Sequence, residues 1–215
     1  MNGKLIVIMG IDGSGKTTLL ENLQNCCLNN ENIKFMRIFK KSKYTKELES
    51  ISKQNNKPLN KCFSKKMRSL AWRADIIDNM FKYVIPELEK GKIVVIDRYF
   101  LCNKVIHSIR NNEFSGADKI MEILPKPDLG IYLNVDADTA LDRINKRGED
   151  KSFHENKEDL LKMKQLYDEF IKEETYPIIT IDANKSEKEV LKKAADSIIE
   201  VLKEDERGKE DELFK

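Results

Sequence analysis

The sequence predicts an α/β fold of three layers, in which a five-stranded parallel sheet carries helices on both faces. Five short apolar runs alternate along the chain with amphipathic stretches, at residues 4–9, 33–39, 92–97, 129–135 and 177–182. Runs of this length that are rich in Val, Ile and Leu are typical of strands buried on both sides. Strands separated by helices pair in parallel through right-handed crossovers. With 215 residues, 40% of them apolar, the chain is large enough for one domain with a full core.

Helical periodicity fills the segments between and after these runs, at residues 16–29, 64–89, 137–146, 157–174 and 187–203. Gly91 follows the second of these segments, in the position where a glycine commonly ends a helix. We expect residues 1–204 to form the domain. Residues 205–215 are dense in charge, and we expect them to form a tail that frays or extends the last helix.

The composition argues against several classes of protein. No apolar run approaches the roughly 20 residues that a membrane-spanning helix needs, and the amino terminus leads into a strand rather than a signal peptide. The four cysteines have neither metal-ligand spacing nor the spacing of a disulfide framework, at positions 26, 27, 62 and 102. We therefore expect a cytoplasmic protein with reduced thiols and no membrane partner.

The net charge of +2 hides a basic segment, since residues 34–68 hold many Lys and Arg against only Glu47 and Glu49. Such a segment can attract a polyanionic substrate, bind nucleic acid, or form a solvated lysine-rich face. It lacks the interleaved aromatic pattern of single-strand binders, so we expect no nucleic acid partner.

The first apolar run leads into the most informative motif of the chain, Gly10-Ile11-Asp12-Gly13-Ser14-Gly15-Lys16-Thr17. It fits G-x-x-x-x-G-K-[ST], a loop whose backbone N–H groups surround nucleotide phosphates. Gly13 and Gly15 allow backbone angles and a close approach that a Cβ atom would forbid. Lys16 can reach the β- and γ-phosphates, and the Thr17 hydroxyl can bind Mg²⁺. The expected nucleotide-binding loop also includes Gly10, Ser14 and Thr18.

The third apolar run ends in Asp97, which Arg98 follows directly. A carboxylate at a strand end beside a phosphate loop can hold Mg²⁺ through its water shell, so Asp97 joins Thr17 as an expected metal ligand. Arg98 is then placed to neutralise a phosphoryl group as it passes between donor and acceptor. The alternative is a structural Asp–Arg pair that caps the next helix.

A short lid is predicted at about residues 147–157. Arg143 and Arg147 lie one helical turn apart, and the stretch that follows Gly148 has no apolar periodicity. Arginines beside a closing loop suit a lid that shields phosphoryl transfer from water. The alternative is a solvated helix end.

The chain resembles the thymidylate kinase family of P-loop nucleoside monophosphate kinases. Five ordered motifs carry the resemblance over roughly residues 4–203: the phosphate loop through Thr18, Ala71-Trp72-Arg73-Ala74, the segment 85–91, Asp97-Arg98-Tyr99, and the segment 127–136 with 140–144. The resemblance implies the P-loop kinase form of the three-layer fold, with a short lid. It also implies ATP and Mg²⁺, transfer to a (deoxy)nucleoside monophosphate with dTMP as the first candidate, and a homodimer.

The resemblance implies a role for individual residues. Asp12 matches the acid that contacts the 3′-hydroxyl of the acceptor sugar, Arg73 an arginine that reaches the acceptor nucleotide, and Arg98 the arginine on its phosphate. The remaining acceptor contacts that we expect come from Phe39, Ser69, Asp97, Cys102, Asn103 and Ile106.

The implied donor site also depends on matched positions. Arg143 and Arg147 match the lid side of the ATP site, and we expect Asn184 to contact ATP. Family members carry a catalytic arginine either in the phosphate loop or in the lid, and Gly13 excludes the first arrangement. Arg147, together with Lys151, is therefore the implied lid cation, and it joins Lys16 and Arg98 as a catalytic residue.

The acceptor-base pocket departs from the family pattern at three positions. The aromatic residue that stacks on thymine is replaced by Ser69, a hydroxyl residue by Cys102, and a second aromatic residue by Ile106. A kinase of another small acceptor, or a nucleotide-binding homologue without activity, is therefore an open alternative.

A GTPase switch is a further alternative, because two segments are similar to the Asn-Lys-x-Asp guanine reader. Residues 184–187 follow the last strand but have Glu in place of Asp, and residues 156–159 match but lie in a helical, polar stretch. No Asp-x-x-Gly follows a strand at the switch position, which disfavours this class.

Overall fold

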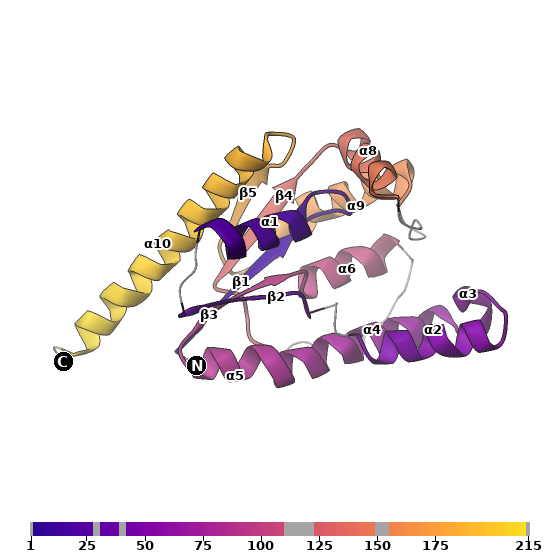
Figure 1. Cartoon of the computed structure of the whole chain (residues 1–215), viewed down its shortest axis with the longest axis horizontal. Helices are drawn as coiled ribbons and strands as arrows, with labels where there is room; N and C mark the ends of the chain where they lie inside the picture. The colour runs from indigo at the N-terminus through magenta and orange to yellow at the C-terminus, as the bar shows by residue number, and fades with distance from the viewer. Residues whose placement is uncertain (1, 28–30, 39–41, 110–122, 149–154, 214–215) are drawn as a thin grey trace.

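The computed structural model describes residues 2–27, 31–38, 42–109, 123–148 and 155–213. These residues form one parallel sheet in the order β2-β3-β1-β4-β5. The strands are β1 (Lys4–Met9), β2 (Ile33–Met36), β3 (Ile93–Asp97), β4 (Leu129–Asn134) and β5 (Ile178–Asp182). Helices cover both faces of the sheet (Figure 1), so the predicted α/β fold with five parallel strands is confirmed.

Strand β1 lies at the centre of the sheet, and its sequence explains why. All five residues from Leu5 to Met9 are apolar and at most 1% exposed, which suits a strand with helices on both sides. Its register pairs Ile8 with Asp97 of β3 and Met9 with Tyr132 of β4. The phosphate loop and Asp97 therefore leave the sheet at the same edge.

The expected helices are present with somewhat different bounds. They are α1 (Lys16–Asn22), α4 (Lys65–Asn79), α5 (Ile85–Glu89), α8 (Ala137–Arg147), α9 (Lys157–Phe170) and α10 (Glu187–Leu213). Single π-helical turns extend α1 over Leu23–Cys27 and join α4 to α5 over Met80–Val84, while a 3₁₀ turn extends α9 over Ile171–Glu173. Helix α10 thus continues through most of the segment 205–215.

Three helices were not predicted: α2 (Tyr44–Gln54), α3 (Leu59–Cys62) and α6 (Phe100–Ile109). Helix α6 carries a helical signal that the prediction did not use, because its polar residues Asn103, Lys104, His107 and Ser108 recur at spacings of three and four. In helix α2, only Leu48 and Ser52 of its 11 residues are buried.

A contact with α4 stabilises α2, although few residues of α2 are buried. The carboxylate of Asp75 on α4, which is 1% exposed, accepts hydrogen bonds from three backbone N–H groups at the start of α2. The donors are Lys43, Tyr44 and Thr45, at 2.6, 2.8 and 2.9 Å. A negative charge at the amino end of a helix also favours its dipole, so Asp75 both starts α2 and fixes it to α4.

The crossovers place the helices on opposite faces of the sheet. Helices α1 and α10 pack together on one face, and α6 and α9 pack together on the other (Figure 1). This division follows from the right-handed crossovers. The chain moves along the sheet in one direction from β1 to β2 and in the opposite direction from β3 to β4 and β5, so the connecting helices lie on opposite faces. Within the described residues, no helix is long and apolar enough to cross a membrane.

Candidate active site

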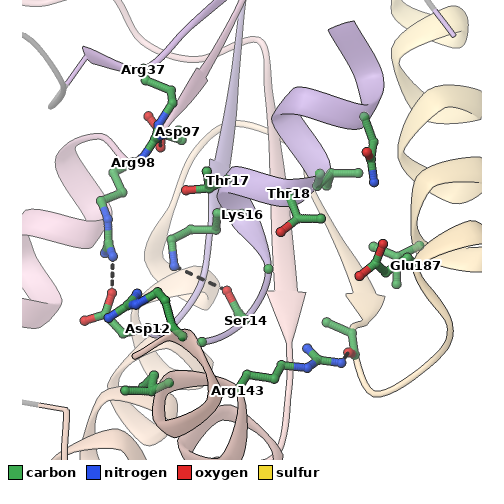
Figure 2. Close-up of a pocket in the computed structure, with 18 of the residues that line it drawn as sticks. Asp12, Ser14, Lys16, Thr17, Thr18, Arg37, Asp97, Arg98, Arg143 and Glu187 are labelled. Atoms are coloured by element: carbon green, nitrogen blue, oxygen red, sulfur yellow. Dashed lines mark hydrogen bonds and ion pairs between the residues drawn. The ribbon is translucent and has the colours of Figure 1, made fainter. Parts of the chain in front are cut away.

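A cavity of about 680 Å³ opens at the carboxyl edge of the sheet (Figure 2). Its size lies within the range of about 300–1,000 Å³ that small-molecule sites occupy. The lining combines the phosphate loop and α1, the ends of β2 and β3, α8, and the segment from the end of β5 into α10. The residues named by the sequence that line it are Asp12, Gly13, Ser14, Gly15, Lys16, Thr17, Thr18, Asp97, Arg98, Arg143 and Arg147.

The phosphate loop needs glycine where it approaches neighbouring backbone. Gly10 has a φ of +147°, and a Cβ atom added there would lie 2.7 Å from the carbonyl oxygen of Leu133. Gly13 has a φ of +77°, and its added Cβ would lie 2.3 Å from the carbonyl oxygen of Ala140. Both separations are shorter than real Cβ contacts, so these glycines let the loop lie against β4 and α8.

Lys16 lies under this loop and supports it. Its ammonium donates to the carbonyl oxygens of Gly10 and Ile11 at 2.9 and 2.6 Å, and to Ser14 Oγ at 3.3 Å. Burial, together with the positive charge of Arg98, lowers the pKa of Lys16 to about 8. A phosphate group would favour the charged form, so this site is complementary to an anion.

Asp97 fits the requirements of a magnesium ligand. It is 6% exposed, and its Oδ1 atom has no hydrogen-bond partner among the described residues. Burial raises the pKa of Asp97 above its ordinary value, although Arg98, Arg37 and Lys16 oppose this shift. Mg²⁺ needs only one or two protein oxygens when phosphates and water supply the rest. Asp97 and the neighbouring Thr17 can meet that need, although the described residues contain no cluster of three metal-binding side chains.

Arg98 and Asp12 form an ion pair across the cavity wall (Figure 2). Arg98 has a φ of +65°, which is uncommon for a residue with a side chain and turns it toward the phosphate loop. Burial opposes the charged form of Arg98, but the Asp12 carboxylate overcomes this and raises the pKa of Arg98 above its ordinary value. Arg98 NH1 has no hydrogen-bond partner among the described residues, so part of the guanidinium is available to a ligand.

Tyr167 of α9 lies behind the phosphate loop, outside the cavity lining. It is fully buried, its ring stacks on Tyr132 with centroids 5.2 Å apart, and its hydroxyl donates to the Gly10 carbonyl at 3.3 Å. Burial raises the pKa of Tyr167, and Cys102 contributes to that rise. The tyrosine therefore stays neutral and fixes the phosphate loop to α9.

The arginines of α8, Arg143 and Arg147, both line the cavity. Arg143 donates to the carbonyl oxygen of Ala183 at 2.9 Å, which connects α8 to the loop after β5. Arg147 forms an ion pair of 2.7 Å with Glu155, a residue that is 4% exposed. Lys151 and most of the predicted lid lie outside the described residues.

The predicted acceptor-base residues come from α4 and α6, and none of them is in the cavity lining. Cys102 lies near Arg98 and Tyr167, whereas Ser69 lies against His107 of α6. Ser69, Arg73, Cys102, Asn103 and Ile106 are all at most 8% exposed. The Oδ1 atom of Asn103 has no hydrogen-bond partner among the described residues. Phe39 lies outside the described residues.

A histidine that the sequence did not single out completes this cluster. His107 is 6% exposed, and its Nε2 atom is 3.0 Å from Ser69 Oγ, within hydrogen-bonding distance. The ring of Trp72 packs edge-on against His107, with centroids 6.3 Å apart. The place of the missing aromatic residue is thus taken by a buried polar pair.

Two other predicted residues lie beside the cavity. Gly10 contributes its carbonyl oxygen to Lys16 from behind the loop. Asn184 accepts a hydrogen bond from the Asp136 N–H at 3.1 Å and donates to Asp182, so its amide holds the loops after β4 and β5 together.

Several residues of the cavity were not among those predicted from the sequence. Arg37 follows β2 directly and has its Nε 3.7 Å from Asp97 Oδ2. Lys185 and Glu187 also line the cavity. Arg37 had a detectable signal, because it is an arginine at the carboxyl end of a predicted strand region. Lys185 and Glu187 could have been found from their place in residues 184–187, the segment after the last strand that is similar to the guanine reader.

Comparison with known proteins gives a consistent result along the chain. The family model for thymidylate kinase matches residues 8–194. A probable thymidylate kinase from Archaeoglobus fulgidus is 30% identical over 204 residues, which cover 93% of this chain and 98% of that protein. Probable thymidylate kinase 2 from Saccharolobus solfataricus is 27% identical over 204 residues, covering 88% and 92%.

Solved structures share the fold. The structure of deoxyadenosine kinase from M. mycoides with bound dCTP superposes with a TM-score of 0.61 at 20% sequence identity. The match covers 91% of this chain and 99% of that chain. At this identity the likeness concerns the arrangement of strands and helices.

Proposed function

This chain belongs to the thymidylate kinase family of nucleoside monophosphate kinases, and we propose that it uses ATP and Mg²⁺ to phosphorylate a (deoxy)nucleoside monophosphate, with dTMP as the principal acceptor. One observation carries the proposal: a single cavity brings together the phosphate loop, four arginines and the buried Asp97, one oxygen of which has no hydrogen-bond partner in the described ranges. The arginines are Arg37, Arg98, Arg143 and Arg147.

The donor phosphates would lie against the phosphate loop, where backbone N–H groups and the start of α1 supply fixed positive dipoles. Lys16 would exchange its contacts with loop carbonyls for the β- and γ-phosphates. Thr17 and Asp97 are the residues that would hold Mg²⁺, which when bound offsets phosphate charge during transfer. Burial and the neighbouring Arg98 lower the pKa of Lys16 to about 8. The negative charge of a bound phosphate would oppose both effects and favour the charged lysine.

The acceptor would be held at the opposite end of the same cavity. Asp12 fixes Arg98, and Arg98 would bind the acceptor phosphate in a planar, bidentate manner. A phosphate oxygen of the acceptor then attacks the γ-phosphorus, and the bond to the bridging oxygen of the leaving nucleoside diphosphate breaks. Arg147 would neutralise the charge that develops on the transferring group, and Glu155 orients Arg147 before substrates bind.

Turnover measured against an acceptor panel tests this proposal. Purified protein, ATP and Mg²⁺ would be combined with dTMP, dUMP, other deoxynucleoside monophosphates, UMP and deoxyadenosine. We expect dTDP formation from dTMP, and a loss of kcat of at least about 100-fold in Lys16→Met, because one electrostatic contact to the transition state is removed. Turnover restricted to a non-nucleotide acceptor, or nucleotide binding without turnover, would reject it.

We expect the acceptor pocket to prefer dTMP over other nucleoside monophosphates less strongly than a pocket with an aromatic side chain would. Stacking of a base on an aromatic side chain contributes roughly 1–3 kcal/mol, and Ser69 cannot supply it. Ile106 and Cys102 likewise replace a larger and a more strongly hydrogen-bonding group. We expect the kcat/KM ratio between dTMP and dUMP or UMP to stay below about a thousandfold, which corresponds to roughly 4 kcal/mol.

A homodimer is part of the proposal, and the exposed face of α4 supports it. Apolar residues recur along α4 and its π turn at alternating spacings of three and four, as in a helix that packs against a partner helix: Met67, Leu70, Ala74, Ile77 and Phe81. Three of them are 45–51% exposed although they are large and apolar. We expect Leu70→Glu to convert a dimer to a monomer in light scattering. A wild-type protein that is monomeric at high concentration would reject the dimer.

A further inference from the structure

We propose that the donor site reads guanine through Glu187 and Lys185, so that GTP serves as a phosphoryl donor at least as well as ATP; this rests on the proposed kinase function. The observation behind it is the placement of residues 184–187, the imperfect Asn-Lys-x-Asp motif. The structure puts Lys185 and Glu187 in the lining of the same cavity as the phosphate loop.

Glu187 lies at one end of the cavity, and Lys185 is part of the same lining. Figure 2 shows Glu187 beyond Thr18, on the side away from Asp12 and Arg98. Arg143 lies below Glu187 in the same view and is fixed to the Ala183 carbonyl at 2.9 Å. A nucleotide whose phosphates occupy the phosphate loop therefore extends its base toward this end.

The segment is held in place by its own hydrogen bonds, which occupy its other polar residues. Asn184 joins the loops after β4 and β5 through Asp136 and Asp182. Ser186 and Glu189 cap α10 reciprocally: Glu189 Oε2 accepts from the Ser186 N–H at 3.1 Å, and Ser186 Oγ accepts from the Glu189 N–H at 3.3 Å. The carboxylate of Glu187 forms no hydrogen bond or ion pair within the described part of the chain, so it is available to a ligand.

The charges of this pair match guanine better than adenine. The Watson–Crick edge of guanine presents two donors, N1–H and the N2 amino group, beside the acceptor O6. A carboxylate accepts from both donors, and an ammonium donates to O6. Adenine reverses the pattern, since its N1 is an acceptor that repels a carboxylate and its amino group repels an ammonium. Glu187 and Lys185 thus provide the acceptor and donor that guanine requires.

The second copy of the motif cannot play this part. Asn156 and Asp159 cap α9 together, because Asn156 Oδ1 accepts from the Asp159 N–H at 3.0 Å and Asn156 Nδ2 donates to the Asp159 carboxylate at 2.8 Å. Neither residue lines the cavity. Only the copy after β5 therefore faces the nucleotide.

The reaction with GTP has the same balance as with ATP. The bond between the γ-phosphorus and the bridging oxygen breaks, a new bond forms to the acceptor phosphate, and GDP leaves with the displaced electron pair. GDP and the nucleoside diphosphate product are formed in equal amounts. Chromatography that resolves GDP, ADP and dTDP follows both donors in one experiment.

Donor competition with a charge-neutral variant tests the inference. We expect wild-type protein, with dTMP as acceptor, to give a GTP kcat/KM no lower than that for ATP. In Glu187→Gln the amide can accept from the adenine amino group and donate to adenine N1, so the ratio of GTP to ATP kcat/KM should fall by about tenfold or more. Lys185→Ala should lower the same ratio. The matched controls are Glu200→Gln and Lys188→Ala, exposed residues of α10 outside the cavity lining, which should leave the ratio unchanged.

The outcomes separate this inference from the proposed function. A wild-type GTP kcat/KM below the ATP value, or a donor ratio unchanged in Glu187→Gln, overturns the guanine assignment while the kinase proposal stands. Absence of transfer from either donor rejects the kinase proposal itself. Calorimetric titration with GDP and ADP provides a readout without turnover, and tighter binding of ADP to the wild type also overturns the assignment.

Discussion

Substitution of Gly10 by alanine tests whether the phosphate loop depends on its contact with β4. The added Cβ would lie 2.7 Å from the Leu133 carbonyl oxygen and 2.8 Å from Ser14 Oγ. Ordinary contact begins at 3.4 Å, so the groups must separate by 3.4 − 2.7, or about 0.7 Å. Leu133 belongs to a buried strand paired with β5, and it cannot retreat. The loop must move instead, and with it the Gly10 carbonyl that holds Lys16 at 2.9 Å and Tyr167 at 3.3 Å.

The magnitude follows from that displacement. A shift approaching 1 Å in groups that position a reacting phosphate costs about 100-fold in rate, or roughly 2.7 kcal/mol. The positive φ of +147° adds an expected stability loss of about 1–2 kcal/mol for a residue with a side chain. Together with the contact itself, we expect Tm to fall by roughly 5–15 °C.

Gly91→Ala is the matched control, because Gly91 also has a positive φ, +76°, but an added Cβ would meet nothing within 4 Å. We expect a stability loss of about 1 kcal/mol and an unchanged kcat/KM. The assay is ADP release with ATP and dTMP, alongside thermal unfolding of each variant. A Gly10→Ala protein within threefold of wild-type kcat/KM, or an equal activity loss in Gly91→Ala, would refute the reasoning.

Four further predictions concern single features of the chain. The pKa of Lys16 is lowered to about 8 in the folded protein, from an ordinary value of 10.5. Between these two pH values the unfolded chain binds more protons than the folded protein does, so the contribution of Lys16 to the free energy of unfolding rises with pH. Phosphate favours charged Lys16, so donor affinity measured by calorimetry should fall as pH rises above about 8, and a flat profile from pH 7 to 9.5 would contradict this. Asp75→Asn should lower stability by about 2–3 kcal/mol, seen as a Tm lower by roughly 5–10 °C, because the amide cannot accept three N–H groups; an unchanged Tm would show that the cap contributes little. Arg147→Ala should lower kcat more than it raises the acceptor KM, since a lid cation acts on transferring charge, and a larger loss in Lys151→Ala would identify the other cation. Deletion of residues 205–215 should change neither activity nor Tm by more than about 2 °C, because the segment has little apolar content, and a larger fall in Tm would show that it packs as part of the fold.

The strands and the phosphate loop could be predicted because their signals are local. Each strand is a continuous apolar run, as in Leu5–Met9, and the loop is one segment whose glycines have backbone requirements of their own. Helix α6 has a weaker signal, since its helical spacing rests on four polar residues, of which Asn103 and His107 are buried. Helix α2 begins at a cap supplied by Asp75, a residue about 30 positions away, as the separations of 30–32 residues show.

The phosphate end and the acceptor-base region also differ in how far the sequence predicts them. Asp97, Arg98 and the phosphate loop follow buried strands directly, so their meeting at one edge follows from parallel pairing alone. The acceptor-base region instead depends on how α4 packs against α6, which brings Ser69 within hydrogen-bonding distance of His107, 38 residues away. The sequence shows only that Ser69 lacks an aromatic ring. It does not show that an imidazole 3.0 Å from its hydroxyl, held by the edge of Trp72, occupies the space instead. Because Ser69 and His107 are within hydrogen-bonding distance of each other, we expect this pair to give an acceptor base less binding energy than an aromatic ring would, in line with the proposed weak preference for dTMP. That expectation depends on packing between helices that no single motif encodes.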